Sequence, residues 1–352
     1  MYIKHTKMRI YIYVANFDIA HLDRLHVEKI DNTSSPSHKG IQMITKSASS
    51  LAPVLATCIA ACIATATPLQ VSAAQKGTLD KIAASKIITL GVRDSSPPFS
   101  YLDDKQSYIG YSIDLCMKIV TAVQKQLGAS SLSVKMQPVT SSTRIPLLAN
   151  GTIDLECGST TNNEERQKQV SFAPTTFVTS NRLLAKKSAN IKTLADLKGK
   201  TLVATAGTTN IKQVTQLNAD KSLGINIIAS KDIGEGFLMV ETGRAVAYSL
   251  DDVVLAALAA NSKSPGDYGI SAEAMSFEPY GIVLRKDDPE FKKAVDAAIT
   301  AVFRSGEINR IYAKWFQAAI PPKGINMNWP MTPQLQKAIA HPTDSADPEV
   351  YK

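Results

Sequence analysis

The stretch "SIDLCMKIVTAVQKQLG" (112–128) decides the fold class, because it is a helix pattern placed between two strand patterns. Apolar residues recur in it at helical spacing, and Gly128 ends the run. The strand patterns are "KIITLGVR" (86–93) and "LSVKMQPV" (132–139), of which the second alternates apolar and polar residues. A strand, a helix and a second strand in this order predict a layered α/β fold with mainly parallel strands.

The same rhythm restarts further along the chain and predicts a second lobe. "TLVATAG" (201–207) and "INIIAS" (225–230) are strand patterns that flank the helix pattern "TTNIKQVTQLNAD" (208–220). A later strand pattern, "YGIVLRKDD" (280–288), then returns the chain to the first unit. We therefore predict a hinged two-lobe architecture with a small-molecule cleft at the carboxyl ends of the strands. The predicted first lobe comprises residues 79–178 and 282–350, and the second comprises residues 182–278.

The N-terminal region contains a pattern typical of a secretory signal. "SLAPVLATCIAACIATATPLQVSAAQ" (50–75) is an apolar run that follows a lysine and ends in small residues. We assign residues 43–74 to a signal peptide and residues 1–42 to an upstream extension outside the fold. "IAAC", which ends at Cys62, resembles a lipoprotein cleavage box, but we favour soluble export over a lipid anchor. No uninterrupted apolar run reaches 18 residues, so we expect no permanent membrane span.

Composition argues against several classes of function. Of the 39 Lys and Arg residues, seven precede residue 75, and of the 31 Asp and Glu residues, four do, which leaves a net charge of +5 on the rest. This small and scattered charge is weak support for nucleic-acid binding, which we do not expect. His341 is the only histidine after residue 74, so a histidine-rich metal site is excluded. We expect neither a metal nor a cofactor.

Polar loops follow several predicted strands at their carboxyl ends, where a doubly wound fold brings loops to one crevice. The loops are "GVRDSSPPFS" (91–100), "TSSTR" (140–144), "DLECGSTTNNEER" (154–166), "TAGTTN" (205–210) and "YSLDD" (248–252). Together they supply three arginines, many hydroxyl groups, and Asp251 or Asp252. Each feature alone has an ordinary explanation: Ser159 or Thr161 as a helix N-cap, or an aspartate in the first turn of a helix.

Taken together, the charges of these loops complement one class of ligand. Hydroxyl groups at a helix start beside a guanidinium bind a carboxylate, and a carboxylate on the facing lobe suits an ammonium group. That combination describes a free amino acid. Two further arginines at the same crevice suit a second carboxylate on its side chain, so an acidic amino acid is the first expectation.

From about residue 85 to 330 the chain resembles the periplasmic solute-binding proteins of polar amino-acid ABC transporters, and it is most similar to their glutamate/aspartate branch. The motifs include "VRDSSPPFSY" (92–101), "PVTSSTRIPLLANGTIDLECGSTTNNEERQKQVSF" (138–172), "GRAVAYSLDD" (243–252) and "IPPKGINMNW" (320–329). The resemblance implies a hinged type II periplasmic-binding fold with a mainly parallel sheet in each lobe. It implies a periplasmic monomer that captures glutamate or aspartate and delivers it to a membrane-embedded ABC permease.

The resemblance also implies three groups of ligand-binding residues. The group for the α-carboxylate is Arg166, Ser159 and Thr161, helped by Thr208 or Thr209. The group for the α-ammonium is Asp251 with the backbone of Ser159. The group for the side-chain carboxylate is Arg93, Arg144 and Ser141.

The chain departs from the glutamate/aspartate branch at one position. Ile233 stands where that branch usually has a histidine that helps to hold the side-chain carboxylate, and an isoleucine cannot donate a hydrogen bond. The preference between glutamate and aspartate, or between an acid and an amide, therefore stays open. Phe99 packs either on the methylene groups of the ligand or in the core.

Two other functions are compatible with the same fold. An enzyme similar to the cyclohexadienyl dehydratases would need a general acid at the cleft, taken from Glu156, Glu164 or Asp251. A ligand sensor would instead dock to a separate receptor. We favour the binding protein and predict no catalytic residues.

Cys116 and Cys157 are the cysteines outside the predicted signal peptide. Cys116 lies on the apolar stripe of the helix 112–128, and Cys157 shares a strand face with Ile153 and Leu155. Export to an oxidising compartment favours a disulfide between them, and two independent buried thiols are the alternative.

Overall fold

The computed structural model describes residues 77–351, which belong to one unit of the chain, Ser72–Lys352. The predicted signal peptide (43–74) and upstream extension (1–42) lie outside the described residues. Within residues 77–351, no helix has the length and apolar character needed to cross a membrane.

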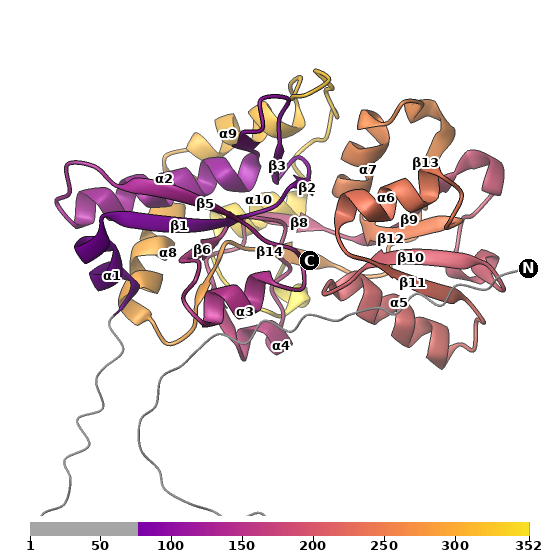
Figure 1. The fold of residues 1–352 in the computed structure, drawn as a ribbon, viewed down its shortest axis with the longest axis horizontal. Helices are drawn as coiled ribbons and strands as arrows, with labels where there is room; N and C mark the ends of the chain where they lie inside the picture. The colour runs from indigo at the N-terminus through magenta and orange to yellow at the C-terminus, as the bar shows by residue number, and fades with distance from the viewer. Residues whose placement is uncertain (1–76, 352) are drawn as a thin grey trace, which may run out of the picture. The chain divides into compact units, whose positions relative to one another are not determined.

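The first of two larger sheets has the strand order β5-β1-β6-β15-β7. β1 pairs in parallel with β5 and β6, whereas β15 is antiparallel to β6 and β7. We call the part of the molecule built on this sheet lobe 1 (Figure 1). Its strands are β1 (Ile87–Val92), β5 (Ser133–Pro138), β6 (Leu155–Glu156), β7 (Val170–Phe172) and β15 (Val283–Arg285).

The second sheet has the order β11-β10-β12-β9-β13 and defines lobe 2. β10 pairs in parallel with β11 and β12, whereas β9 is antiparallel to β12 and β13. The α/β fold class is confirmed, and the return strands make each sheet mixed. The strands of lobe 2 are β9 (Asn181–Lys186), β10 (Thr201–Thr205), β11 (Asn226–Ser230), β12 (Ala247–Asp251) and β13 (Tyr268–Ile270).

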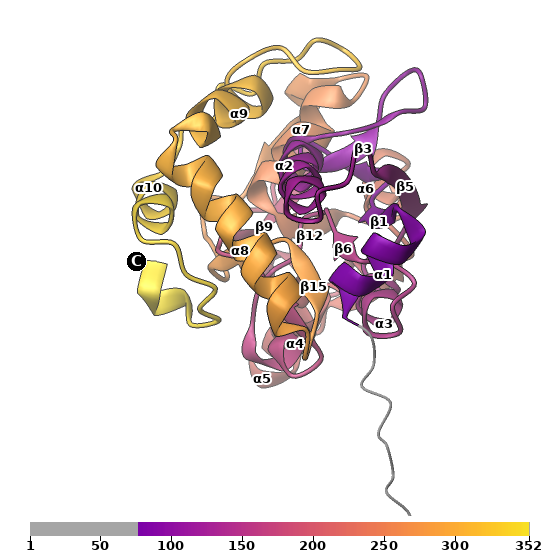
Figure 2. The same cartoon turned by 90° about the vertical axis from the view of Figure 1, so that its left-hand side faces the viewer.

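Helices cover both sheets. In Figure 2, α2, α8 and α9 lie beside one another in lobe 1 and contact each other. The helices of lobe 1 are α1 (Thr78–Ser85), α2 (Tyr111–Gln126), α3 (Arg144–Ala149), α4 (Glu164–Gln167), α8 (Pro289–Arg304), α9 (Glu307–Phe316) and α10 (Pro333–Ala340). Those of lobe 2 are α5 (Thr209–Asp220), α6 (Ile233–Glu241) and α7 (Asp252–Asn261).

The smaller elements complete the chain. A three-stranded sheet follows β1, and short 3-10 helices occupy several turns. These elements are β2 (Ser95–Ser96), β3 (Ser100–Leu102), β4 (Tyr108–Ile109), η1 (Lys187–Ala189), η2 (Leu194–Leu197), η3 (Pro265–Asp267) and η4 (Pro348–Tyr351).

Two short strands carry the chain between the sheets. β8 (Phe177–Thr179) and β14 (Glu278–Tyr280) pair antiparallel, with Phe177 opposite Tyr280. They coincide with the segments 177–181 and 278–282 that the sequence predicts as crossings. The predicted lobe ranges and the closing motion about these crossings stay predictions.

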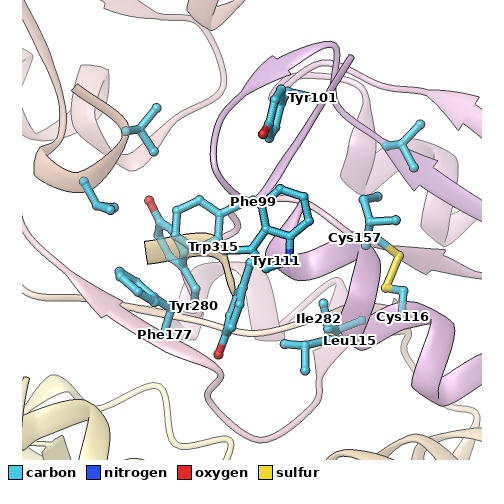
Figure 3. Close-up of a cluster of buried hydrophobic side chains, with 14 of the residues drawn as sticks. Phe99, Tyr101, Tyr111, Leu115, Cys116, Cys157, Phe177, Tyr280, Ile282 and Trp315 are labelled. Carbon is cyan, nitrogen blue, oxygen red and sulfur yellow. A yellow bond between two sulfur atoms is a disulfide. The ribbon is translucent and has the colours of Figure 1, made fainter. Parts of the chain in front are cut away.

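An aromatic cluster lies beside these crossing strands (Figure 3). The ring of Phe99 meets Phe177 edge-on at 4.9 Å between centroids and Tyr280 at 5.2 Å. Phe99 is 1% exposed, so of its two expected roles the structure favours the core. At the edge of the cluster, Cys116 and Cys157 form the expected disulfide, with 6.2 Å between their Cα atoms. The bond joins α2 to the loop that follows β6.

Candidate functional site

The loop between β6 and α4 is extended, so the ordinary explanation of Ser159 or Thr161 as a helix N-cap does not apply. The N-cap of α4 is Asn163, whose side chain accepts a hydrogen bond from the Arg166 N–H at 2.9 Å. Neither Ser159 nor Thr161 caps the helix, and Arg166 lies in its only turn. The reason is tertiary: Thr161 forms a β-bridge with Tyr280, which keeps this part of the chain extended.

Arg166 joins the loops of the two lobes. Its Nη1 donates to the Thr161 carbonyl at 2.7 Å, and its Nη2 donates to the Gly207 carbonyl at 3.2 Å. The guanidinium is buried, and burial, followed by the charge of Arg144, lowers its pKa to about 10. A buried cation of this kind favours an anionic partner.

The facing loop of lobe 2 begins α5. The Thr208 hydroxyl caps the helix by accepting from the Ile211 N–H at 3.2 Å, and the Thr209 hydroxyl donates to Glu278 at 3.0 Å. Gly207 has φ +78°, and a Cβ there would lie 2.7 Å from the Ser142 backbone. Glycine therefore lets the loop before α5 approach closely the loop between β5 and α3, which contains Ser142.

Arg144 begins α3 and its guanidinium contacts the β6–α4 loop. Its Nη1 donates to the Ser159 carbonyl at 3.1 Å and to the Thr160 hydroxyl at 2.5 Å. Thr160 donates in turn to Glu156 at 2.5 Å, and the Glu156 carboxylate lies 3.8 Å from the same Nη1. Sequence reasoning missed the supporting role of Thr160 and considered Glu156 only as an enzymatic acid. The alternation of side chains along β6 could have indicated this role of Glu156, because it places Glu156 on the face opposite Leu155, toward Arg144 of α3.

Arg93 follows β1 and lies beside the same loop. A Cβ on Gly158 would lie 2.9 Å from the Arg93 Cγ and 2.3 Å from Glu156 Oε1, so only a glycine permits this approach. Burial, followed by the charge of Arg144, lowers the pKa of Arg93 to about 10. Arg144 lies close enough to act on both other guanidiniums, so Arg93, Arg144 and Arg166 form one cationic cluster.

Four buried polar groups of this site lack a hydrogen-bond partner within the described residues. One is an acceptor, Oε1 of Glu156, and the other three are donors: Nη1 of Arg93, Nε of Arg144 and the hydroxyl of Ser141. These are the three residues that the sequence assigned to the side-chain carboxylate of the ligand. A buried donor without a partner is costly, so their grouping favours an anion that accepts from all three.

The acidic side of the site comes from lobe 2 and β14. Asp251 accepts from Asn210 at 2.8 Å and from the hydroxyl of Tyr280. Burial, followed by the charge of Glu278, raises the pKa of Asp251 to about 7. Asp252, the other aspartate considered from the sequence, instead pairs with Arg182 at 3.1 Å. Asp251, rather than Asp252, therefore lies among the buried polar groups at the junction of the lobes.

The remaining predicted residues also lie at the junction of the lobes. The Ser159 hydroxyl is 2.8 Å from that of Ser96, and the Thr161 hydroxyl is 3.5 Å from that of Thr209. A groove of about 230 Å³ is lined by residues from both lobes, including Ser141, Arg166, Gly207, Thr208 and Thr209. Four of the nine predicted ligand-binding residues line this groove: Ser141, Arg166, Thr208 and Thr209. The other five are buried at the same junction of the lobes without lining the groove: Arg93, Arg144, Ser159, Thr161 and Asp251.

Ile233 begins α6 at the same junction. It is buried, and the next residue, Gly234, donates its N–H to Ser95 of lobe 1 at 3.1 Å. The start of α6 thus meets the loop that carries Arg93. No group of three or more His, Cys, Asp or Glu residues within the described part of the chain is arranged to hold a metal ion.

Comparison with known proteins identifies the family. A sequence model of the bacterial extracellular solute-binding proteins, family 3, matches residues 88–318. This chain belongs to that family. The solute-binding resemblance inferred from the motifs is therefore confirmed.

Individual relatives show which members of the family this chain is similar to. The chain is 55% identical to the L-glutamate/L-aspartate-binding protein of Pseudomonas aeruginosa over 77% of its own length and 90% of the relative. It is 48% identical to the glutamate/aspartate import solute-binding protein of Escherichia coli over 76% of its length and 89% of the relative. A crystal structure of a mutant of ArgBP from T. maritima has a TM-score of 0.61 at 28% identity, covering 68% of this chain and 99% of that one.

These relatives are solute-binding proteins rather than enzymes. They therefore support the binding-protein assignment over the enzymatic alternative. The structural neighbour likewise supports the type II fold assignment.

Proposed function

We propose that this protein binds glutamate or aspartate between its lobes, outside the cytoplasm, and delivers it to an ABC permease. The observation that carries the proposal is the cluster of buried Arg93, Arg144 and Arg166, in which the first two retain unpartnered buried donors within the described residues. Glu156 is the only carboxylate within 4 Å of these guanidiniums in the described part of the chain. The cluster thus has an excess of positive charge, which a dicarboxylic amino acid would offset.

Each charged group of such a ligand has a matching set of residues. Arg166, which contacts both lobes, would bind the α-carboxylate by a bidentate pair, with hydroxyl groups from Ser159, Thr161, Thr208 or Thr209. Asp251 would bind the α-ammonium together with the Ser159 carbonyl. Arg93, Arg144 and Ser141 would bind the side-chain carboxylate.

Closure of the lobes about β8 and β14 would trap the ligand, with residues 79–178 and 282–350 moving against residues 182–278. The names of the two relatives support import as the purpose of binding. We infer a periplasmic monomer that docks to its permease in the closed state. Small-angle scattering tests the closure: ligand should make the protein more compact, and an unchanged radius of gyration would contradict it.

Because Ile233 cannot donate a hydrogen bond, the preference for an acidic ligand over an amide is also part of the proposal. Without a donor at this position, the side-chain carboxylate would be held by Arg93, Arg144 and Ser141. Two guanidiniums still favour an acid over an amide, because an amide carries no charge.

A thermal-shift screen of the purified protein with each of the twenty amino acids tests the proposed function. A ligand at 100 times its dissociation constant should stabilise the protein by about 2.7 kcal/mol. We expect glutamate and aspartate to raise the melting temperature, and glutamine and asparagine to raise it less. A shift produced only by neutral or basic amino acids would show that the assignment is wrong.

A further inference from the structure

The C-terminal segment, residues 341–351, lies against α4, the short helix that carries Arg166. We call this segment the C-terminal strap. In the structure it follows α10 and ends in η4, which contacts β14 (Figure 1).

The strap holds both ends of the short helix α4. The carbonyl of Asp344 accepts hydrogen bonds from Asn162 Nδ2 and from Gln167 Nε2, each at 2.8 Å. Gln167 Nε2 also donates to the Asn162 side-chain oxygen at 2.9 Å. Asn162 precedes α4 and Gln167 ends it, so one backbone carbonyl of the strap joins the two flanks of Arg166.

The strap is itself anchored at several points. The Thr175 N–H donates to the Thr343 carbonyl at 2.9 Å, and the Thr175 hydroxyl donates to the hydroxyl of Tyr351 at 2.8 Å. The Tyr351 ring is 1% exposed and stacks on Phe277, 6.5 Å away. The Asp344 carboxylate forms an ion pair with Lys292 of α8 at 2.9 Å. These anchors lie beside both crossing strands and on lobe 1, so the Asp344 carbonyl is fixed in place.

We propose that the C-terminal strap positions Arg166 for the carboxylate shared by all amino-acid ligands. α4 has only four residues, and an isolated helical turn is unstable in water. The hydrogen bonds from Asn162 and Gln167 to the strap hold that turn, and with it the Arg166 guanidinium, before ligand arrives. This preorganisation reduces the ordering cost of binding. Asn162, Gln167 and Asp344 are positioning residues, and the inference rests on the proposed function.

Calorimetry with L-glutamate and L-aspartate tests the strap on three variants: Asn162→Ala, Gln167→Ala and a chain that ends at Pro342. Gln216→Ala is the matched control, because Gln216 makes one hydrogen bond on an exposed helix face, to Asp220 at 2.6 Å. We expect each single variant to lower the affinities for L-glutamate and L-aspartate by the same factor, about tenfold. The truncated chain should have lower affinities still, and Gln216→Ala should bind both ligands with the wild-type affinities.

The ratio of the two affinities separates positioning from general damage. An unchanged glutamate-to-aspartate ratio, with melting temperatures of the unliganded single variants close to that of the control, supports the strap. Affinities within twofold of wild type in both single variants, or an altered ratio, would overturn it. If the truncated chain fails to fold, the single variants decide. If the wild-type protein binds neither amino acid, the proposed function fails first.

Discussion

Lobe 1 and lobe 2 contribute opposite charges to the junction between them. The loops of lobe 1 supply three buried arginines, whereas β12 of lobe 2 and the crossing strand β14 supply Asp251 and Glu278. In the proposed function, two similar α/β units would divide the charged groups that recognise one zwitterion. Lobe 1 would supply the guanidiniums for its carboxylates, and lobe 2 the carboxylate for its ammonium group.

Burial acts on the two sides in opposite directions. It lowers the pKa of Arg93 and Arg166 to about 10 and raises that of Asp251 to about 7. In each case burial favours the neutral form, because charge is poorly solvated there. Near neutral pH the two arginines stay charged and Asp251 is the group that titrates, so a bound ammonium group would favour its charged form and couple binding to loss of its proton.

The largest effect is expected at the residue that touches both lobes. Arg166→Ala should abolish detectable binding of every amino acid, because it removes the partner of their common carboxylate. Loss of one member of a buried charge pair costs about 3–5 kcal/mol, or two to four decades of affinity. Calorimetry measures this, with Arg310→Ala on the exposed face of α9 as the control. A glutamate affinity within tenfold of the wild-type value would contradict the role of the lobe 1 arginines in binding the carboxylates of the ligand.

The disulfide should affect stability. It should leave intact the charge division, by which lobe 1 supplies the arginines, and lobe 2 and β14 supply the carboxylates. Replacing both Cys116 and Cys157 with alanine removes a cross-link between residues 41 positions apart. We expect a loss of about 2–4 kcal/mol in the free energy of unfolding, measured by denaturant titration. The ratio of glutamate to glutamine affinity should not change, because the link lies within lobe 1. A changed ratio would mean that the disulfide also sets the position of the arginines.

The acidic side should make binding depend on pH. An exposed aspartate has a pKa of about 3.9, so the folded unliganded protein binds the Asp251 proton more tightly than the unfolded chain does. The stability from this group is present below about pH 4 and is lost as pH rises to about 7. Bound ammonium favours the charged carboxylate, so affinity should rise about tenfold from pH 6 to pH 8.

Asp251→Asn is the control for this pH dependence. The charged and polar groups that act on Asp251 are Glu278, Tyr280, Asn210, Asp252 and Arg166, and all five remain in the variant. Its affinity should be low and nearly constant from pH 6 to pH 8. An unchanged pH profile in this variant would assign the titration to another group.

The smallest effect is expected at the start of α6. Ile233→His adds a donor near Arg93 and should strengthen glutamate or aspartate binding by about 0.5–1.5 kcal/mol, roughly two- to tenfold. Ile233→Leu keeps the position apolar and serves as the control. Equal affinities in the two variants would indicate that position 233 does not reach the ligand.

The sequence predicted the elements better than it predicted the contacts between them. Periodicity located the strands, and the position of each loop after a strand brought Arg93, Arg144 and Asp251 to one place. It missed Asn163 as the cap of α4, because the bridge between Thr161 and Tyr280 depends on a strand more than 100 residues later.

The same limit applies to the groups that support the site. Glu278 lies near Asp251 through the return crossing, and the strap reaches α4 from the far end of the chain. No local pattern marks either contact, because both are set by tertiary packing. The arginines were found because each lies in the loop or first helical turn that follows a strand, which local sequence marks.

The most direct test of the central claim is a titration of glutamate and glutamine into the wild-type protein, Arg93→Ala and Arg144→Ala. The charge division predicts that each variant loses about 1.5–3 kcal/mol of glutamate binding, because the second arginine remains, and much less of glutamine binding. The preference for the acid should therefore shrink in both variants. Glutamate affinity unchanged in both would contradict an acidic ligand at this site while leaving the solute-binding fold intact.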